Sequence, residues 1–414
     1  MNYIKRNKLL YIYTLLLLTP VLNFNYIYTI YYWTFFSIIF ILSYSKFNIF
    51  CEILESSYEK NLFFSLIILS YIIFLSIFKN IINITNIEIV IASFFYLCIN
   101  FLVIFVNNFN NKLEFENWIK FTINIISFYA FYHIFKIIAF SYDFDLDSIW
   151  NLIAPFRVNY VLDKEDMLIG FEGLKFLRSG GIYDNPNVQV FTNIMGLGLL
   201  LIDNKYNTKI KVFLSIFIII STLLTLSRQG YALLFLLFLL SIFGRKIWLI
   251  YVFTAILIII LSVSLMTGIE KDYINMLFIR LVNQDGINYS EDLRYKIYQY
   301  GLNLIENDLI LGLGYKQSPQ LFSREFGFEG GDAHSFFLTV LIEVGILGTI
   351  LTLVIIFLPF LACLNSHNKN LKFNLFIFFI IFISIGLFEN GPSQLHILWL
   401  YFMINLNIIK LYRN

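Results

Sequence analysis

Long uninterrupted runs of apolar residues recur along this chain of 414 residues and constrain its fold more than any other feature. A helix needs about 17–25 residues to cross the roughly 30 Å hydrocarbon layer of a membrane. Twelve runs reach or approach this length, and three of them are short. The runs are Leu9–Asn23, Tyr26–Tyr44, Leu62–Phe78, Ile87–Val106, Trp118–Phe140, Val188–Ile202, Ile210–Leu226, Gly230–Phe243, Ile247–Met266, Ser335–Cys363, Phe373–Phe388 and Leu395–Ile409. Because lipid offers no hydrogen bonds, a continuous apolar run must satisfy its backbone groups internally, as only a helix does. The pattern predicts an all-α polytopic membrane protein of about twelve transmembrane helices.

Composition excludes a water-soluble enzyme. Hydrophobic residues make up 59% of the chain and charged residues 14%, whereas soluble domains contain about 45–50% and about 25%. A net charge of +2 is too small to indicate a nucleic-acid partner. Three cysteines, none in a long connection, predict no disulfides. No repeat or linker is visible, so residues 1–414 are expected to form a single integral membrane domain in the lipid bilayer.

Basic residues set the expected topology. With the N-terminus in the cytoplasm, the short cytoplasmic connections contain Lys5, Arg6, Lys8, Lys46, Lys60, Lys112, Lys205, Lys209, Lys211, Arg245, Lys246, Lys369, Lys372, Lys410 and Arg413. The opposite short connections contain only Lys79 and Arg228. This asymmetry predicts that both termini are cytoplasmic. The first apolar run follows a basic segment but lacks a small-residue cleavage site, so we expect it to be retained. The two long connections, 141–187 and 267–334, are then extracytoplasmic.

Arginine is unexpectedly abundant on the predicted outer side. Six of the nine arginines lie there, against the positive-inside trend. A guanidinium is a planar, permanently charged fork that binds phosphate oxygens in pairs. A phosphorylated extracytoplasmic ligand is therefore predicted, although ion pairs with loop carboxylates explain Arg157, Arg280 and Arg324 better.

Arg228 is the strongest single candidate. It connects two short runs, and the second, Gly230–Phe243, spans only roughly 21 Å as a helix. The connection is therefore expected to lie in a depression below the outer surface. A charge at that depth costs roughly 2.5–3.5 kcal/mol on insertion scales, which favours a functional role over a snorkelling side chain.

Three further motifs flank the long connections. Residues 178–187 read RSGGIYDNPN, in which an arginine and a glycine pair precede a helix start, a setting that favours anions. The second connection ends with Gly312-Leu313-Gly314 and then His334. Nine residues later comes Glu343-Val344-Gly345-Ile346-Leu347-Gly348.

Together these motifs resemble the O-antigen polymerase and O-antigen ligase family of bacterial surface-glycan assembly. The resemblance extends roughly from Arg178 to Gly348, and one departure is Ser335, where many members have Asn. It implies glycosyl transfer from an undecaprenyl-diphosphate-linked oligosaccharide at the outer face of the bacterial inner membrane, without a cofactor. A chain-length regulator is a candidate partner.

These inferences assign roles to individual residues. We expect Arg228, Arg178 and Arg294 to bind the diphosphate, and His334 to act as general base or to orient the acceptor. Asn187, Tyr183 and Tyr315 are further candidates for substrate contact. Glu343 would lie opposite His334 on a continuous helix, so we expect it to pack beside Gly345 and Gly348.

Two other groups of polar residues can be explained without a function. The acidic run Asp143-Phe144-Asp145-Leu146-Asp147 lies outside, away from nucleotide sugars, so no metal site is predicted there. His133 and Lys136 lie three residues apart, and snorkelling explains them as well as function does.

The leading hypothesis is an O-antigen or capsular polysaccharide polymerase. The first alternative is a ligase that transfers the finished glycan to a lipid A core or another acceptor. A transporter of lipid-linked glycan is the alternative from another class, but transporters usually show repeated halves and charge near the membrane midplane.

Overall fold

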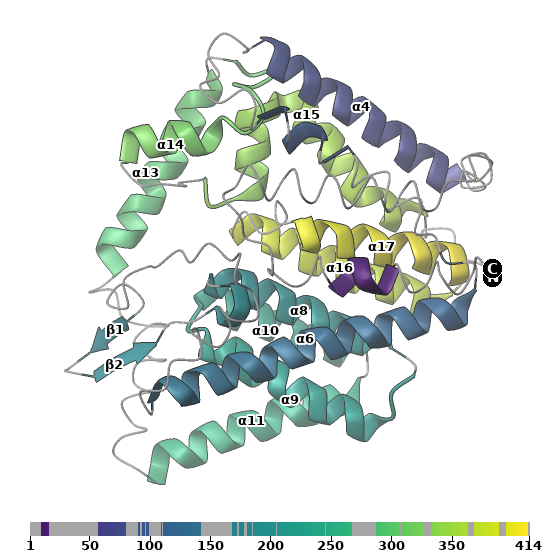
Figure 1. The fold of residues 1–414 in the computed structure, drawn as a ribbon, viewed down its shortest axis with the longest axis vertical. Coiled ribbons are helices and arrows are strands. Elements are labelled where there is room, and N and C mark those ends of the chain that lie inside the picture. The colour runs from purple at the N-terminus through teal and green to yellow at the C-terminus, as the bar shows by residue number, and fades with distance from the viewer. Residues whose placement is uncertain are drawn as a thin grey trace. The chain divides into compact units, whose positions relative to one another are not determined.

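The computed structural model describes most of the predicted spans. The described residues are 10–15, 57–79, 90–98 except 92 and 96, 109, 111–141, 168–171, 174–177, 180–183, 185–203, 205–244, 246–266, 287–306, 308–326, 333–362, 368–388 and 395–412. They form mainly α-helices (Figure 1). In chain order the elements are α4 (Ser57–Lys79), α6 (Lys112–Ser141), β1 (Leu168–Phe171), β2 (Leu174–Leu177), the 3₁₀ turn η1 (Gly181–Tyr183), α8 (Pro186–Ile202), α9 (Thr208–Leu224), α10 (Arg228–Phe243), α11 (Ile247–Met266), α13 (Ile287–Glu306), α14 (Ser318–Phe326), α15 (Phe336–Ala362), α16 (Lys369–Phe388) and α17 (Leu395–Tyr412).

Nine of the twelve predicted spans coincide with described helices. The bounds of α11 are those predicted, and the other helices differ by a few residues. The predicted spans Leu9–Asn23, Tyr26–Tyr44 and Ile87–Val106 lie wholly or largely outside the described residues. The total of twelve therefore stays a prediction.

Four described helices are long and apolar enough to cross a membrane by length and composition. They cover Lys60–Phe78, Lys112–Ala139, Phe336–Leu361 and Lys369–Leu387. Shorter apolar helices cover Pro186–Ile202, Arg228–Phe243, Ile247–Ile256 and Ile397–Leu411. The described part of the chain is thus that of a helical membrane protein, as the apolar runs predicted.

A short hairpin accompanies the helices. Strands β1 and β2 pair antiparallel, with Leu168 opposite Leu177 and Phe171 opposite Leu174. The hairpin lies within the first long connection, where no regular structure was predicted.

The chain divides into two compact units. Unit 1 comprises Met1–Leu10, Phe24–Lys112 and Ser290–Asn414, and unit 2 comprises Tyr11–Asn23 and Leu113–Tyr289. Unit 1 contains α4, most of α13, and α14 to α17. Unit 2 contains nearly all of α6, the hairpin, and α8 to α11.

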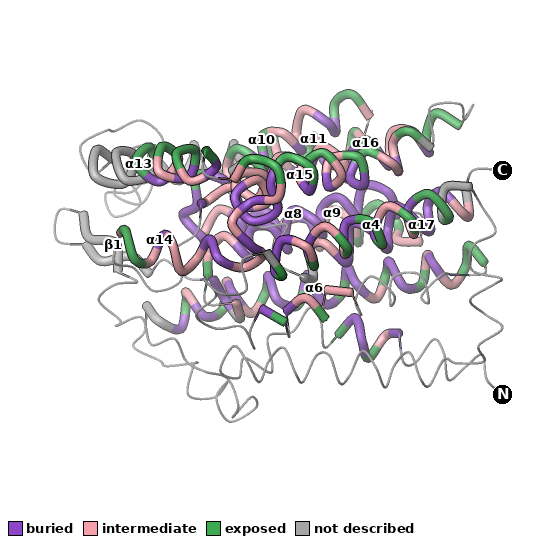
Figure 2. Tube along the Cα trace, turned by 90° about the horizontal axis from the view of Figure 1, so that it is seen from above, coloured by how far each residue is buried: buried purple, intermediate pink, exposed green. Residues whose placement is uncertain are grey.

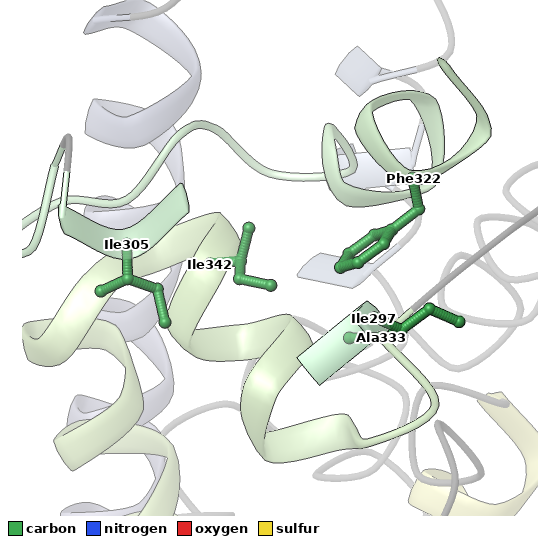
Figure 3. Packing of buried hydrophobic residues seen from close by; sticks show 5 residues of the cluster. All are labelled: Ile297, Ile305, Phe322, Ala333 and Ile342. Carbon is green, nitrogen blue, oxygen red and sulfur yellow. The ribbon is translucent and has the colours of Figure 1, made fainter. Parts of the chain in front are cut away.

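In unit 1, α15 packs on α4, α14, α16 and α17. The rings of Phe382 and Tyr401 stack with centroids 4.2 Å apart, and the Tyr401 hydroxyl donates to the Ile356 carbonyl at 2.7 Å. A separate apolar cluster joins α13 and α14 to the start of α15 (Figure 3). Its buried members are Ile297, Ile305, Phe322, Ala333 and Ile342. This cluster fixes the segment that ends at His334, because Ala333 is one of its members.

In unit 2, α8 is the most buried helix, with every residue from Val188 to Ile202 buried (Figure 2). It packs on α9 and α10. A Cβ added to Gly196 would lie 2.7 Å from the Ile126 side chain of α6, so the glycine permits close approach of the two helices. The unit therefore holds the first residues of α8 rigidly against its neighbours.

Candidate functional site

The starts of α8 and α10 meet within unit 2. The Asn185 side chain caps α8 by accepting a hydrogen bond from the Asn187 backbone N–H at 2.9 Å, and Pro186 occupies the first turn. Ser227 directly precedes α10, and its hydroxyl donates to the Asn187 side-chain oxygen at 2.9 Å. Two motifs forty residues apart in sequence are thereby joined. Each helix start also carries the partial positive charge of its helix dipole, so the junction favours an anion.

The bend between α9 and α10 is conformationally restrained. Leu226 is buried and has φ of 52°, a value uncommon for a residue other than glycine. The Thr225 hydroxyl donates to the Thr222 carbonyl at 2.7 Å and accepts from the Ser227 N–H at 3.3 Å. Such backbone conformations persist where the surroundings hold them and often occur at functional sites. Here the bend sets the direction in which α10, and hence Arg228, begins.

Arg228 is the first residue of α10, and its side chain is exposed. Close packing behind it is permitted by Gly230, whose added Cβ would lie 3.1 Å from Val190 of α8 and 3.2 Å from Thr222 of α9. Arg228 therefore begins at a tightly packed three-helix junction, directly after the serine that bonds to Asn187.

The glycine pair before α8 serves packing. A Cβ on Gly180 would lie 2.4 Å from the Asn185 backbone carbon. Gly181 has φ of 64°, and its added Cβ would lie 3.0 Å from both His133 and the Gln189 side-chain oxygen. The Tyr183 N–H donates to the Gly180 carbonyl at 3.1 Å, which closes the turn. Substitution at either glycine would displace this turn.

Tyr183 faces the interior of unit 2. Its ring meets the Tyr129 ring edge to face with centroids 6.2 Å apart. Burial is the main cause that raises the pKa of the Tyr183 phenol well above its ordinary value. The residue as a whole is half-buried. Its predicted contact with sugar stays a prediction.

In unit 1, His334 lies immediately before α15. It has φ of 46° and is half-buried. The Ser335 carbonyl accepts from the Thr339 N–H at 2.9 Å, and the Ser335 hydroxyl reaches the Gly386 carbonyl of α16 at 3.5 Å. Serine and asparagine are both favoured at a helix start, so Ser335 suits the place where many family members have Asn.

The assumption of one continuous helix from His334 to Glu343 was wrong. The helix begins after His334, at Phe336, so His334 is not part of it. Beyond Glu343 the helix is broken at Gly345, which has φ of 68° and ψ of −170°. Residues 308–314 fill the break. The Leu313 N–H donates to the Ile342 carbonyl at 2.8 Å, and the Ile346 N–H donates to the Leu309 carbonyl at 2.8 Å. Backbone groups freed by the break are thus satisfied by a segment that precedes it.

Glu343 joins three helices. Its side chain is buried and accepts a hydrogen bond from the Ser318 hydroxyl of α14 at 2.5 Å. Its backbone carbonyl accepts from the Ser76 hydroxyl of α4 at 3.0 Å. The Ser76 oxygen in turn accepts from the Tyr315 N–H at 3.1 Å. These contacts support the packing role expected for Glu343 and place half-buried Tyr315 beside it.

Several predicted residues fall outside what the structure describes. Arg178, Arg157, Arg280 and the acidic run 143–147 lie outside the described residues. Arg294 lies in α13, but its side chain is not among those described. Arg228 and Asn187 belong to unit 2, whereas His334 and Tyr315 belong to unit 1. That all of these residues act on one substrate stays a prediction.

Sequence reasoning undervalued His133 and Lys136 of α6. Both are buried in unit 2, with exposed fractions of 0% and 8%, so snorkelling does not describe them. A signal was present, because Gln189 and Asn193 are also polar and lie one helical turn apart in an apolar run. That pattern indicates polar contacts between helices rather than a lipid-facing surface.

Comparison with known proteins identifies a family over part of the chain. The fold and the buried polar residues define a helical membrane protein with a polar site built at helix starts. Residues 213–353 match the family model described as O-antigen ligase. This stretch therefore carries the domain of the O-antigen ligase family, which confirms the resemblance there and includes Arg228, His334 and the Gly345 break. Searches of curated proteins and of solved structures gave no match.

Proposed function

We propose that this protein is a glycosyltransferase that uses an undecaprenyl-diphosphate-linked oligosaccharide on the outer side of the bacterial inner membrane. The observation that carries the proposal is the hydrogen bond between Ser227 and Asn187, which places Arg228 beside the start of α8. The family match over residues 213–353 supports glycosyl transfer as the chemistry. Two helix starts and a guanidinium together suit a diphosphate.

The reaction follows from the donor. The acceptor hydroxyl oxygen attacks the anomeric carbon, and the bond from that carbon to the diphosphate oxygen breaks. Its electron pair stays on the diphosphate, and the hydroxyl proton passes to a base. Direct attack inverts the anomeric carbon. Charge develops on the departing diphosphate, where fixed positive groups stabilise the transition state.

The residues divide these tasks. Arg228 binds the departing diphosphate, with Asn187 beside it and with Arg178 and Arg294 as further guanidinium groups. The proposal assigns no step to a metal or a cofactor. His334 accepts the hydroxyl proton or orients the hydroxyl, and its backbone conformation before α15 holds it at a defined place.

Replacing His334 with alanine should lower kcat by about 10²–10⁴-fold, because general-base catalysis contributes that much. The KM for the lipid-linked donor should change little, since the diphosphate contacts remain. The rate is measured with purified protein in vesicles containing the donor. Ser335→Asn is the matched control, and we expect it to retain the wild-type rate. If His334→Ala retains the wild-type kcat, His334 has no role in the mechanism.

Among glycosyl transfers we favour polymerisation. A polymerase holds two lipid diphosphates at once, because donor and acceptor are both lipid-linked. Both reactions need the same donor site, so Arg178, Arg228 and Arg294 do not separate them. Ligation of the finished glycan is the second candidate, and the description of the matching family model favours it.

Deletion of the protein should separate these two reactions. A polymerase mutant should carry single repeat units on its surface, whereas a ligase mutant should carry no attached glycan. Electrophoresis of the surface glycan, with complementation by the wild-type chain, distinguishes the two patterns. We expect single repeats, and an intact ladder of polymer would contradict both reactions.

A further inference from the structure

Two ionisable side chains are buried in a membrane-length helix. His133 and Lys136 lie three residues apart on one face of α6, within the candidate span Lys112–Ala139. Burying such groups in a membrane costs free energy, and they usually mark function. The Lys136 ammonium lies 3.5 Å from the Gly181 carbonyl, in the turn that leads into α8. Lysine thus contacts the backbone that precedes the proposed diphosphate site.

A chain of hydrogen bonds extends from this pair to two more helices. The His133 Nδ1 atom lies 2.9 Å from the Ser221 hydroxyl of α9. The Asn193 amide of α8 donates to the Ser221 oxygen at 3.0 Å and to the Thr222 oxygen at 3.2 Å. The Gln189 amide donates to the Asn193 side-chain oxygen at 2.9 Å. These bonds hold the C-terminal end of α6, the end of α9 and the start of α8 together.

The turn at residues 180–183, named the Gly181 turn, lies between side chains of α6 and α8. Its added Cβ would lie 3.0 Å from both His133 and the Gln189 oxygen, so the backbone is wedged between these side chains. The elements held here are those that carry the site. Gly181 is followed by the Asn185 cap of α8, and α9 is followed by the bend that starts α10 at Arg228. Movement of the turn would therefore move Asn187 relative to Arg228.

We propose that Lys136 and His133 are positioning residues that hold the Gly181 turn and, through it, the diphosphate contacts at the starts of α8 and α10. This inference rests on the proposed function. Lys136 also contacts the backbone that leads into α8, where positive charge favours the same anion as the helix start itself. Neither residue contacts the reacting sugar.

The test compares Lys136→Met, which removes charge and donor, with Lys136→Gln, which keeps an N–H donor for the Gly181 carbonyl. Lys120→Met is the matched control, because Lys120 is an exposed lysine of the same helix, roughly 24 Å away along α6. With purified protein in donor-containing vesicles, Lys136→Met should raise the donor KM about tenfold. The kcat should stay within about twofold, Lys136→Gln should recover part of the KM, and Lys120→Met should match the wild type.

A second readout is independent of activity. Hydrogen exchange of the Tyr183 and Asn185 amides reports directly on the turn, since both amides are bonded within it at 3.1 and 2.6 Å. Lys136→Met should accelerate exchange at these amides and leave that of α11 unchanged, with an unaltered melting temperature. Unchanged exchange at the turn would overturn the inference, and faster exchange throughout unit 2 would show a purely structural role. If the wild type forms no glycosidic bond, the proposed function fails while the exchange result still decides the inference.

Discussion

Replacing Arg228 with lysine should abolish surface polymer as completely as replacing it with alanine. Lysine keeps the charge but loses the planar fork that binds two phosphate oxygens at once. The site cannot easily compensate, because the buried bend at Leu226 and the bond from Ser227 to Asn187 fix where α10 begins. Loss of one preorganised transition-state donor costs about 10²–10³ in rate. The glycan ladder on a gel measures the result, with protein levels determined by immunoblotting.

Arg324→Lys is the matched control for this experiment. Arg324 is exposed in the last turn of α14, in unit 1, and the proposal gives it no role. We expect that variant to produce the wild-type ladder. A full ladder from Arg228→Lys would show that charge alone suffices at this position. The inferred binding of two phosphate oxygens by the guanidinium would then be wrong.

Replacing Gly345 with alanine should prevent accumulation of folded protein. The added Cβ would lie 2.3 Å from the Ile310 carbonyl oxygen and 2.6 Å from the Gly312 nitrogen, and φ is positive. These are backbone atoms of the segment that fills the break in α15, so no side chain can rotate to relieve the clash. Strain and displacement together should cost roughly 3 kcal/mol or more. Detergent-solubilised yield and the melting temperature measure this loss.

Gly301→Ala provides the comparison within the same unit. Its added Cβ would meet the ends of the Ile342, Leu338 and Phe322 side chains, at 3.1, 3.2 and 3.5 Å. These flexible groups can shift, and alanine has the higher helix propensity, so we expect a change below about 1 kcal/mol. A stable, active Gly345→Ala protein would mean that residues 308–314 do not occupy the break.

The helices were predictable because membrane helices are specified locally. A continuous apolar run must satisfy its own backbone, so α11 and most other helices follow directly from hydropathy. The junction of Asn187 with Ser227 was foreseen only as two separate helix starts. Which starts meet depends on how α8, α9 and α10 pack, and single-sequence patterns do not contain that information.

The break in α15 could not be predicted from local sequence. An apolar run from Phe336 to Ala362 looks like one span, and Gly345 alone does not indicate a break. The break is stable because Leu309 and Leu313, 37 and 29 residues upstream of their partners Ile346 and Ile342, supply hydrogen bonds. The burial of Lys136 was indicated only indirectly, by the polar residues Gln189 and Asn193, because the buried face of α6 is decided by its partner helices within unit 2.

The central claim is that fixed guanidinium groups hold a lipid diphosphate while a new glycosidic bond forms. Its most direct test supplies purified protein, in vesicles, with undecaprenyl-diphosphate-linked oligosaccharide and measures longer glycan and released undecaprenyl diphosphate together. The account predicts equal amounts of both products from the wild type and neither from Arg228→Lys. Movement of the lipid-linked donor between leaflets, with no new bond and no released diphosphate, would contradict it.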